Sequence, residues 1–98
     1  MTVDQILIDV RSLLTEIIGE EYALGLDIGT STALDRDLQL ESIEFVKLAT
    51  MLTERYGNRV DFVAFLADKE LDEIIQMTVG EVVNHVADCL TFEDSIDD

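Results

Sequence analysis

The sequence predicts an all-α fold: a small four-helix bundle of three major helices and one short helix, with a long ordered loop between helices 1 and 2. Three observations predict it. Apolar residues recur at helical spacing in three long segments. The 98-residue length suits one domain with a single core. Residues 19–41 hold three glycines and no clear periodicity, so they form a loop whose length favours a functional role.

The first major helix is expected to start at Thr2, which forms a capping-box pattern with Gln5, and to end at Gly19. Its core stripe is Val3, Ile6, Leu7, Val10, Leu14, Ile17 and Ile18. In the following loop, apolar residues at irregular intervals are expected to hold the chain against the bundle. They are Leu24, Leu26, Ile28, Leu34 and Leu38.

The second major helix begins near Ser42 and stops at Gly57-Asn58. Its core stripe is Phe45, Leu48, Ala49, Leu52 and Tyr56. The third opens with a capping-box pattern, Thr78 with Glu81, and buries Val82, Val83, Val86 and Leu90.

Two apolar groups lie between these helices. Leu71, Ile74 and Ile75 predict a short helix started by Asp68. The i, i+3, i+4 spacing of Phe62, Phe65 and Leu66 favours a further helical turn over an apolar strap across the core. We divide the chain into a helical domain over residues 1–92 and an acidic C-terminal tail over residues 93–98.

The charge of the chain limits the kinds of molecule that it can bind. The chain carries 22 acidic and six basic residues, a net charge of −16 shared by both halves. This field repels nucleic acid and anionic membranes and favours basic protein surfaces. No apolar run is long enough to span a bilayer, and the N-terminus lacks the basic residues of a secretory signal. We therefore expect a cytoplasmic monomer with no nucleic-acid or membrane partner.

A catalytic or metal site is not expected. The single histidine, His85, and the single cysteine, Cys89, favour structural roles, and they cannot form a nucleophile–base–orienter set by themselves. A calcium loop starting at Asp27 fails because Thr32 stands where glycine is needed and Leu38 where glutamate is needed. We expect no enzymatic activity.

The nonapeptide DLQLESIEF, residues 37–45, places Ser42 at the first turn of the second major helix. A phosphate group on this serine would lie beside the positive end of the helix dipole, which stabilises an anion by up to about 1 kcal/mol. A simple N-cap is the alternative reading of the same position.

The segment DLQLESIEFVKLATMLTERYG resembles the signature of the acyl carrier protein family, in which Asp-Leu-x-Leu-Asp-Ser-Leu precedes the second helix. Asp37, Leu38, Leu40, Ser42 and Ile43 occupy the matching positions. TVGEVVNHV, at residues 78–86, resembles the start of the family's last helix. The resemblance covers most of residues 1–92, which we expect to be an acyl-carrier-like domain.

The resemblance implies that Ser42 accepts 4′-phosphopantetheine from coenzyme A through a dedicated phosphopantetheinyl transferase. The arm would carry acyl intermediates as thioesters to acyl-loading and ketosynthase- or synthetase-type enzymes with basic docking surfaces. We expect the residues around Ser42 to bind these partners. They are Asp35, Asp37, Leu40, Glu41, Ile43, Glu44, Val46 and Lys47.

Departures from the family pattern bear on the pathway. Glu41 replaces the usual aspartate, Gln39 stands where glycine is frequent, and Lys47 falls where carriers of fatty acid synthesis tend to be acidic. A carrier of polyketide or other secondary-metabolite biosynthesis therefore ranks first, with fatty acid synthesis also open. A peptidyl carrier of nonribosomal synthesis ranks lower, because its two glycines before the serine are absent. An unmodified acidic helical interaction module is the remaining alternative.

Overall fold

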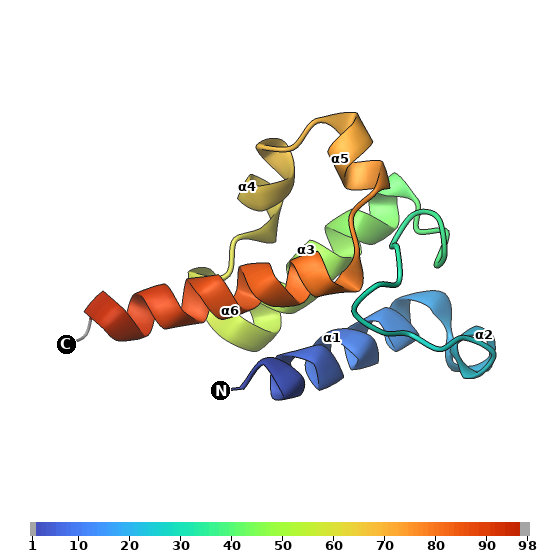
Figure 1. The fold of residues 1–98 in the computed structure, drawn as a ribbon, viewed down its shortest axis with the longest axis horizontal. Helices are drawn as coiled ribbons and strands as arrows, with labels where there is room; N and C mark the ends of the chain where they lie inside the picture. Colours follow the sequence, from blue (N-terminus) through green and yellow to red (C-terminus); the bar gives the residue numbers. More distant parts are fainter. Residues whose placement is uncertain (1, 97–98) are drawn as a thin grey trace.

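Three long helices build the molecule. In the computed structural model, which describes the backbone of residues 2–96 and the side chains of residues 2–90, these are α1 (Val3–Ile18), α3 (Ser42–Tyr56) and α6 (Val79–Ile96). Three short helices and a 3₁₀ turn complete the described part: α2 (Glu20–Leu24), η1 (Gly57–Arg59), α4 (Phe62–Ala67) and α5 (Leu71–Ile75). Figure 1 shows α4 and α5 together on one side of the long helices. The predicted all-α class is confirmed.

Helix α1 starts and ends as its sequence predicts. The Gln5 N–H donates to the Thr2 hydroxyl oxygen at 3.2 Å, which completes a capping box, and Gly19 ends the helix with φ 96°. The buried stripe includes Leu13, which the sequence analysis omitted. Val3 was wrongly placed in the core: it is 51% exposed, because the first turn lies at the margin of the bundle.

A single core joins the long helices. The stripe predicted for α3 is entirely buried, and so is the stripe predicted for α6. Val60, Phe62, Met77 and Val79, which come from the connections and the start of α6, are completely buried with them. The core therefore contains residues from every long helix. Buried residues of the loop before α3 pack in the same core, which fixes the position of that loop.

The long loop differs from the prediction at its beginning. Residues Glu20–Leu24 form α2, whose five residues are too few to show a helical period. Leu24 was expected to hold the loop to the bundle but is 86% exposed, since this short helix directs it to solvent. Ile28, Leu34 and Leu38 are buried as predicted.

Backbone hydrogen bonds attach the loop to the start of α6. The Val79 N–H donates to the Thr32 carbonyl oxygen at 2.8 Å, and the Gly80 N–H donates to that of Thr30 at 2.8 Å. The first N–H groups of a helix have no partner inside the helix, so the loop carbonyls satisfy them. A further bond joins the Leu34 N–H to the Met77 carbonyl at 3.0 Å. This explains how a long segment without periodicity is ordered.

The segment between α3 and α6 forms two helices. The turn over Phe62, Phe65 and Leu66 is helical, as the spacing favours, and Asp61 caps it by accepting from the Ala64 N–H at 3.0 Å. Asp68 does not start the next helix, which is a correction: it is the C-cap of α4. Glu70 is the N-cap of α5, because its N–H is paired with the Glu73 carboxylate at 3.2 Å.

The backbone of α6 continues to Ile96, through part of the segment assigned to an acidic tail. Residues 97–98 lie outside the described part, so the division at residue 92 stays a prediction. Over the described residues, no helix has the length and apolar character needed to cross a membrane.

Candidate functional site

Ser42 is the first residue of α3, and its side chain is exposed. The N-cap is Glu41, whose N–H donates to the Glu44 carboxylate at 2.8 Å. Ser42 therefore lies one residue inside the helix and does not have the N-cap position that the simpler reading required. Its hydroxyl is accessible for a covalent attachment.

In the segment that precedes Ser42, buried and exposed residues alternate. Leu38 and Leu40 are each 3% exposed, while Gln39 between them is exposed and has a left-handed backbone with φ 57°. The turn before them is closed by Asp37, whose carboxylate accepts from the Ala33 N–H at 2.8 Å. Two buried leucines on either side of a left-handed residue fix where the chain enters α3.

An apolar groove opens beside Ser42. Its volume is about 270 Å³, and Ser42 is one of its lining residues. The other lining residues come from the loop, α3, α4 and α5. They are Asp35, Leu40, Phe45, Val46, Leu66, Leu71, Ile74 and Ile75. A group attached at Ser42 thus has an apolar surface within reach.

Of the docking residues predicted around Ser42, some are exposed to solvent and one is buried. Glu41, Ile43, Val46 and Lys47 are exposed, with Ile43 at 60% and Val46 at 53%. Leu40 is corrected: at 3% exposure it lines the groove and packs in the core, because its side chain faces the bundle.

The predicted acidic docking residues differ in how far they are exposed to solvent. Asp37 is exposed, whereas Asp35 and Glu44 are partly buried. One oxygen of Asp37 and one of Glu44 accept backbone N–H groups, so these carboxylates also hold the loop and the helix start in place. A partner would meet their remaining oxygens.

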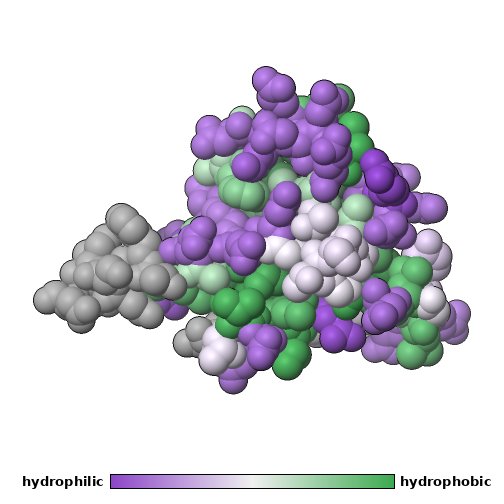
Figure 2. Space-filling model, in the orientation of Figure 1, coloured by the Kyte–Doolittle hydropathy of each residue, from purple (hydrophilic) through white to green (hydrophobic). Residues whose placement is uncertain are grey.

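Sequence reasoning missed the contribution of α5. Leu71 is 71% exposed and Ile75 is 37% exposed, and both lie along the groove next to Ser42. Figure 2 shows hydrophobic surface at the outer edge of this helix. The apolar character of both residues was visible, but five residues cannot show which side of a helix faces outward.

His85 and Cys89 do not line this groove. The Cys89 Sγ lies 3.7 Å from the His85 Nε2. Burial raises the pKa of the Cys89 thiol and lowers the pKa of His85, so both groups favour their neutral forms. A neutral thiol is a poor nucleophile.

In a comparison with protein families, the model of the phosphopantetheine attachment site matches residues 10–78. The matched region contains Ser42, the groove and the whole of α3 to α5. Comparisons with curated proteins and with solved structures gave no match.

Proposed function

Because the chain belongs to the phosphopantetheine attachment site family, we propose that Ser42 is the residue that holds its prosthetic group. A carrier protein of this family bears a covalently attached 4′-phosphopantetheine. The observation that carries the assignment is the exposed hydroxyl at the first turn of α3, beside an apolar groove.

The residues of α3 fit a phosphodiester at this position. The helix has 15 residues, and its positive dipole end lies at Ser42. A neighbouring anion is stabilised there by up to about 1 kcal/mol, although the charges of Glu41 and Glu44 oppose it. When bound, the group supplies a terminal thiol on which an acyl chain is held as a thioester.

The exposed side chains around Ser42 form the proposed docking surface, which we define as Glu41, Ile43, Val46 and Lys47 of the α3 region with Leu71 and Ile75 of α5. Its centre is apolar, and the chain around it is strongly acidic. Such a surface attracts basic enzymes quickly, while a small apolar contact lets them dissociate. These properties suit a carrier that visits several enzymes in turn.

The groove is the proposed shelter for the acyl part of the cargo. Its lining is mostly apolar, and the attachment residue lies on its edge, so an acyl chain attached through Ser42 could bury methylene groups there. Each buried methylene contributes about 0.8 kcal/mol. Transfer to an enzyme then requires the chain to leave the groove.

Lys47 favours a pathway outside primary fatty acid synthesis. It places a positive charge on the exposed side of α3, in a chain whose net charge is −16. We infer a carrier of polyketide or other secondary-metabolite type, with fatty acid and peptidyl carriers as the alternatives. The Lys47→Glu variant should then change which synthase is served without unfolding the domain, and unchanged partner preference would contradict this.

The attachment is tested by mass spectrometry of the intact protein. Incubation with coenzyme A and a promiscuous phosphopantetheinyl transferase should add the mass of one arm to the wild type and nothing to Ser42→Ala. Ser31→Ala is the matched control, since Ser31 is another exposed serine, in a turn of the long loop, and it should accept the arm normally.

Two outcomes would overturn the assignment. An arm on Ser42→Ala would place the attachment elsewhere. A folded wild type that accepts no arm would favour the unmodified interaction module.

A further inference from the structure

Among the described residues that line the groove beside Ser42, only Asp35 is charged. The others are Ser42 itself and seven apolar residues. Asp35 is partly buried and directly follows Leu34, which is completely buried and whose N–H donates to the Met77 carbonyl at 3.0 Å. The carboxylate therefore belongs to a firmly held stretch of the loop.

The Asp35 carboxylate differs from its acidic neighbours in having no hydrogen bond within the fold. The carboxylates of Asp37 and Glu44 each accept a backbone N–H at 2.8 Å. Among residues 2–90, whose side chains the structure describes, no hydrogen bond or ion pair engages the carboxylate of Asp35. Its oxygens are therefore free to contact a molecule that enters the groove.

A free carboxylate in an apolar lining discriminates between acyl chains. A saturated chain that covers it removes water from a charged group without supplying a hydrogen bond, which costs free energy. A chain with its own carboxylate adds repulsion between like charges. A hydroxyl group on the chain supplies a donor, and a hydrogen bond to a charged acceptor is stronger than a neutral one. An ammonium group is attracted, but its desolvation offsets most of the gain.

We propose that Asp35 is a specificity-determining residue of the groove, and that it favours neutral acyl chains with a hydroxyl group over saturated chains and over chains with a carboxylate. The apolar residues of α3, α4 and α5 would contact the methylene groups, while Asp35 accepts from the hydroxyl. The choice of cargo rests on the proposed attachment at Ser42, whereas the selectivity of the groove rests on its lining.

Two isomers test the selectivity on the protein without its arm. 1-Hexanol and methyl pentyl ether have the same formula, but only the alcohol donates a hydrogen bond. NMR titration of the methyl groups of Val46 and Leu71 measures both dissociation constants. The wild type should bind the alcohol about fivefold more tightly than the ether, and hexanoate more weakly than either. An alcohol that binds no more tightly than the ether would overturn the proposal.

Two substitutions separate the charge of Asp35 from its ability to accept a hydrogen bond. Asp35→Leu removes both, so the preference for 1-hexanol over the ether should disappear. Asp35→Asn keeps an acceptor oxygen and removes the charge, so it should keep this preference and bind hexanoate more tightly than the wild type does. A preference that survives in Asp35→Leu would overturn the role of Asp35.

Asp72→Asn is the matched control for charge. Asp72 is exposed on α5 and does not line the groove, so this variant removes the same charge from the same molecule without changing the lining. All three dissociation constants should stay close to those of the wild type. Equal gains in hexanoate binding by Asp72→Asn and Asp35→Asn would assign the discrimination to net charge and overturn that part of the proposal.

The loaded protein tests the cargo itself. An octanoyl arm is transferred from octanoyl coenzyme A, and the shifts of the Val46 and Leu71 methyl groups are compared with those of the protein with an unacylated arm. The octanoyl chain should perturb them more in Asp35→Leu than in the wild type, because no carboxylate is then desolvated. Equal perturbation in both proteins would overturn the selection of cargo.

These outcomes are separate from those of the proposed function. A protein that prefers the alcohol but accepts no arm would contradict the attachment at Ser42 alone. A protein that accepts the arm but shows no preference between the isomers would contradict the selectivity of the groove alone.

Discussion

At the scale of single residues, the site depends on backbone positions that the side chains do not reveal. Gln39 has φ 57°, a conformation in which a side chain is crowded by the backbone. The frequent glycine at this position in acyl carrier proteins has a physical explanation here, because glycine adopts this conformation without strain. The backbone conformation of Gln39, just before α3, therefore lowers the stability of the folded state somewhat.

Replacing Gln39 by glycine should raise the free energy of unfolding by about 0.5 kcal/mol, since relief of about 1–2 kcal/mol of strain exceeds the entropic cost of glycine. Urea denaturation measures the difference. Gln76→Gly is the matched control: Gln76 is exposed with an ordinary φ of −91°, so glycine there should only lower stability. Equal losses in the two variants would show that Gln39 is unstrained.

Gly80 is required by a close approach between the loop and α6. A Cβ at this position would lie 2.9 Å from the Thr30 carbonyl oxygen, which belongs to the backbone and cannot easily move. Gly80→Ala should therefore lower the free energy of unfolding by about 1–3 kcal/mol, despite the better helix propensity of alanine.

Gly29→Ala provides the comparison for Gly80, because a Cβ at Gly29 would meet no atom within 4 Å. Its unfolding free energy in urea should change by less than about 0.5 kcal/mol. A Gly80→Ala protein as stable as Gly29→Ala would contradict the close approach.

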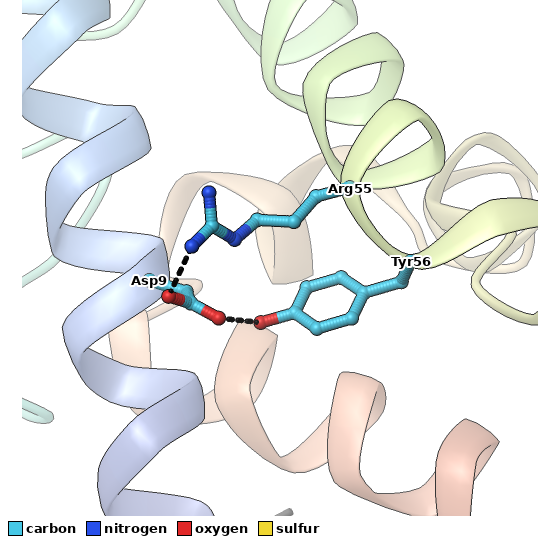
Figure 3. A network of polar contacts seen from close by, with 3 residues as sticks. All are labelled: Asp9, Arg55 and Tyr56. Atoms are coloured by element: carbon cyan, nitrogen blue, oxygen red, sulfur yellow. Dashed lines mark hydrogen bonds and ion pairs between the residues drawn. The ribbon is translucent and has the colours of Figure 1, made fainter.

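At the scale of elements, α1 and α3 are joined by a polar network at the end of α3 away from Ser42. Figure 3 shows Asp9 of α1 between Arg55 and Tyr56. The Tyr56 hydroxyl donates to the Asp9 carboxylate at 2.7 Å, and the Arg55 guanidinium donates to its other oxygen at 2.7 Å. Arg55 is half exposed, so solvent screens its ion pair, and the tyrosine bond on the buried side contributes more.

Tyr56→Phe should lower the free energy of unfolding by about 1–2 kcal/mol, because it removes a hydrogen bond to a charged acceptor and leaves that carboxylate less satisfied. Burial, with the Asp9 contact, raises the pKa of Tyr56 above its ordinary value of 10. A raised pKa gives stability that is present below about pH 10 and is lost as the pH rises further.

The wild type should therefore lose stability above pH 10 more steeply than Tyr56→Phe. Denaturation at several alkaline pH values measures the two slopes. Tyr22→Phe removes an exposed tyrosine and should keep the wild-type slope, so an equal effect of both substitutions would contradict the role of the network.

At the scale of the whole molecule, charge acts on both stability and recognition. A net charge of −16 is compressed into a body of 43 × 28 × 22 Å. Like charges at this density repel one another in the folded state, while the same field speeds encounter with basic enzymes. The acidic surface that serves docking therefore opposes folding.

Salt should raise the melting temperature, because it screens this repulsion. A thermal melt in sodium chloride from about 0.01 M to about 0.5 M measures the effect, because the Debye length falls from about 30 Å to well below 10 Å over this range. A variant with Glu20→Gln and Glu21→Gln, both exposed residues of α2, should respond less than the wild type. A melting temperature independent of salt would contradict self-repulsion.

The sequence by itself determined the long helices, the buried stripes of α3 and α6 and the position of Ser42, because each of these follows from local periodicity, capping residues and a short motif. Only the tertiary structure decided which apolar residues remain outside. Leu71 and Ile75 stay exposed beside Ser42, and Leu40 turns inward, since burial depends on how distant segments pack. The short helices and the stack of His85 on Phe65 likewise needed the structure, because elements of five or six residues show no period and a contact between α4 and α6 joins residues far apart in the chain.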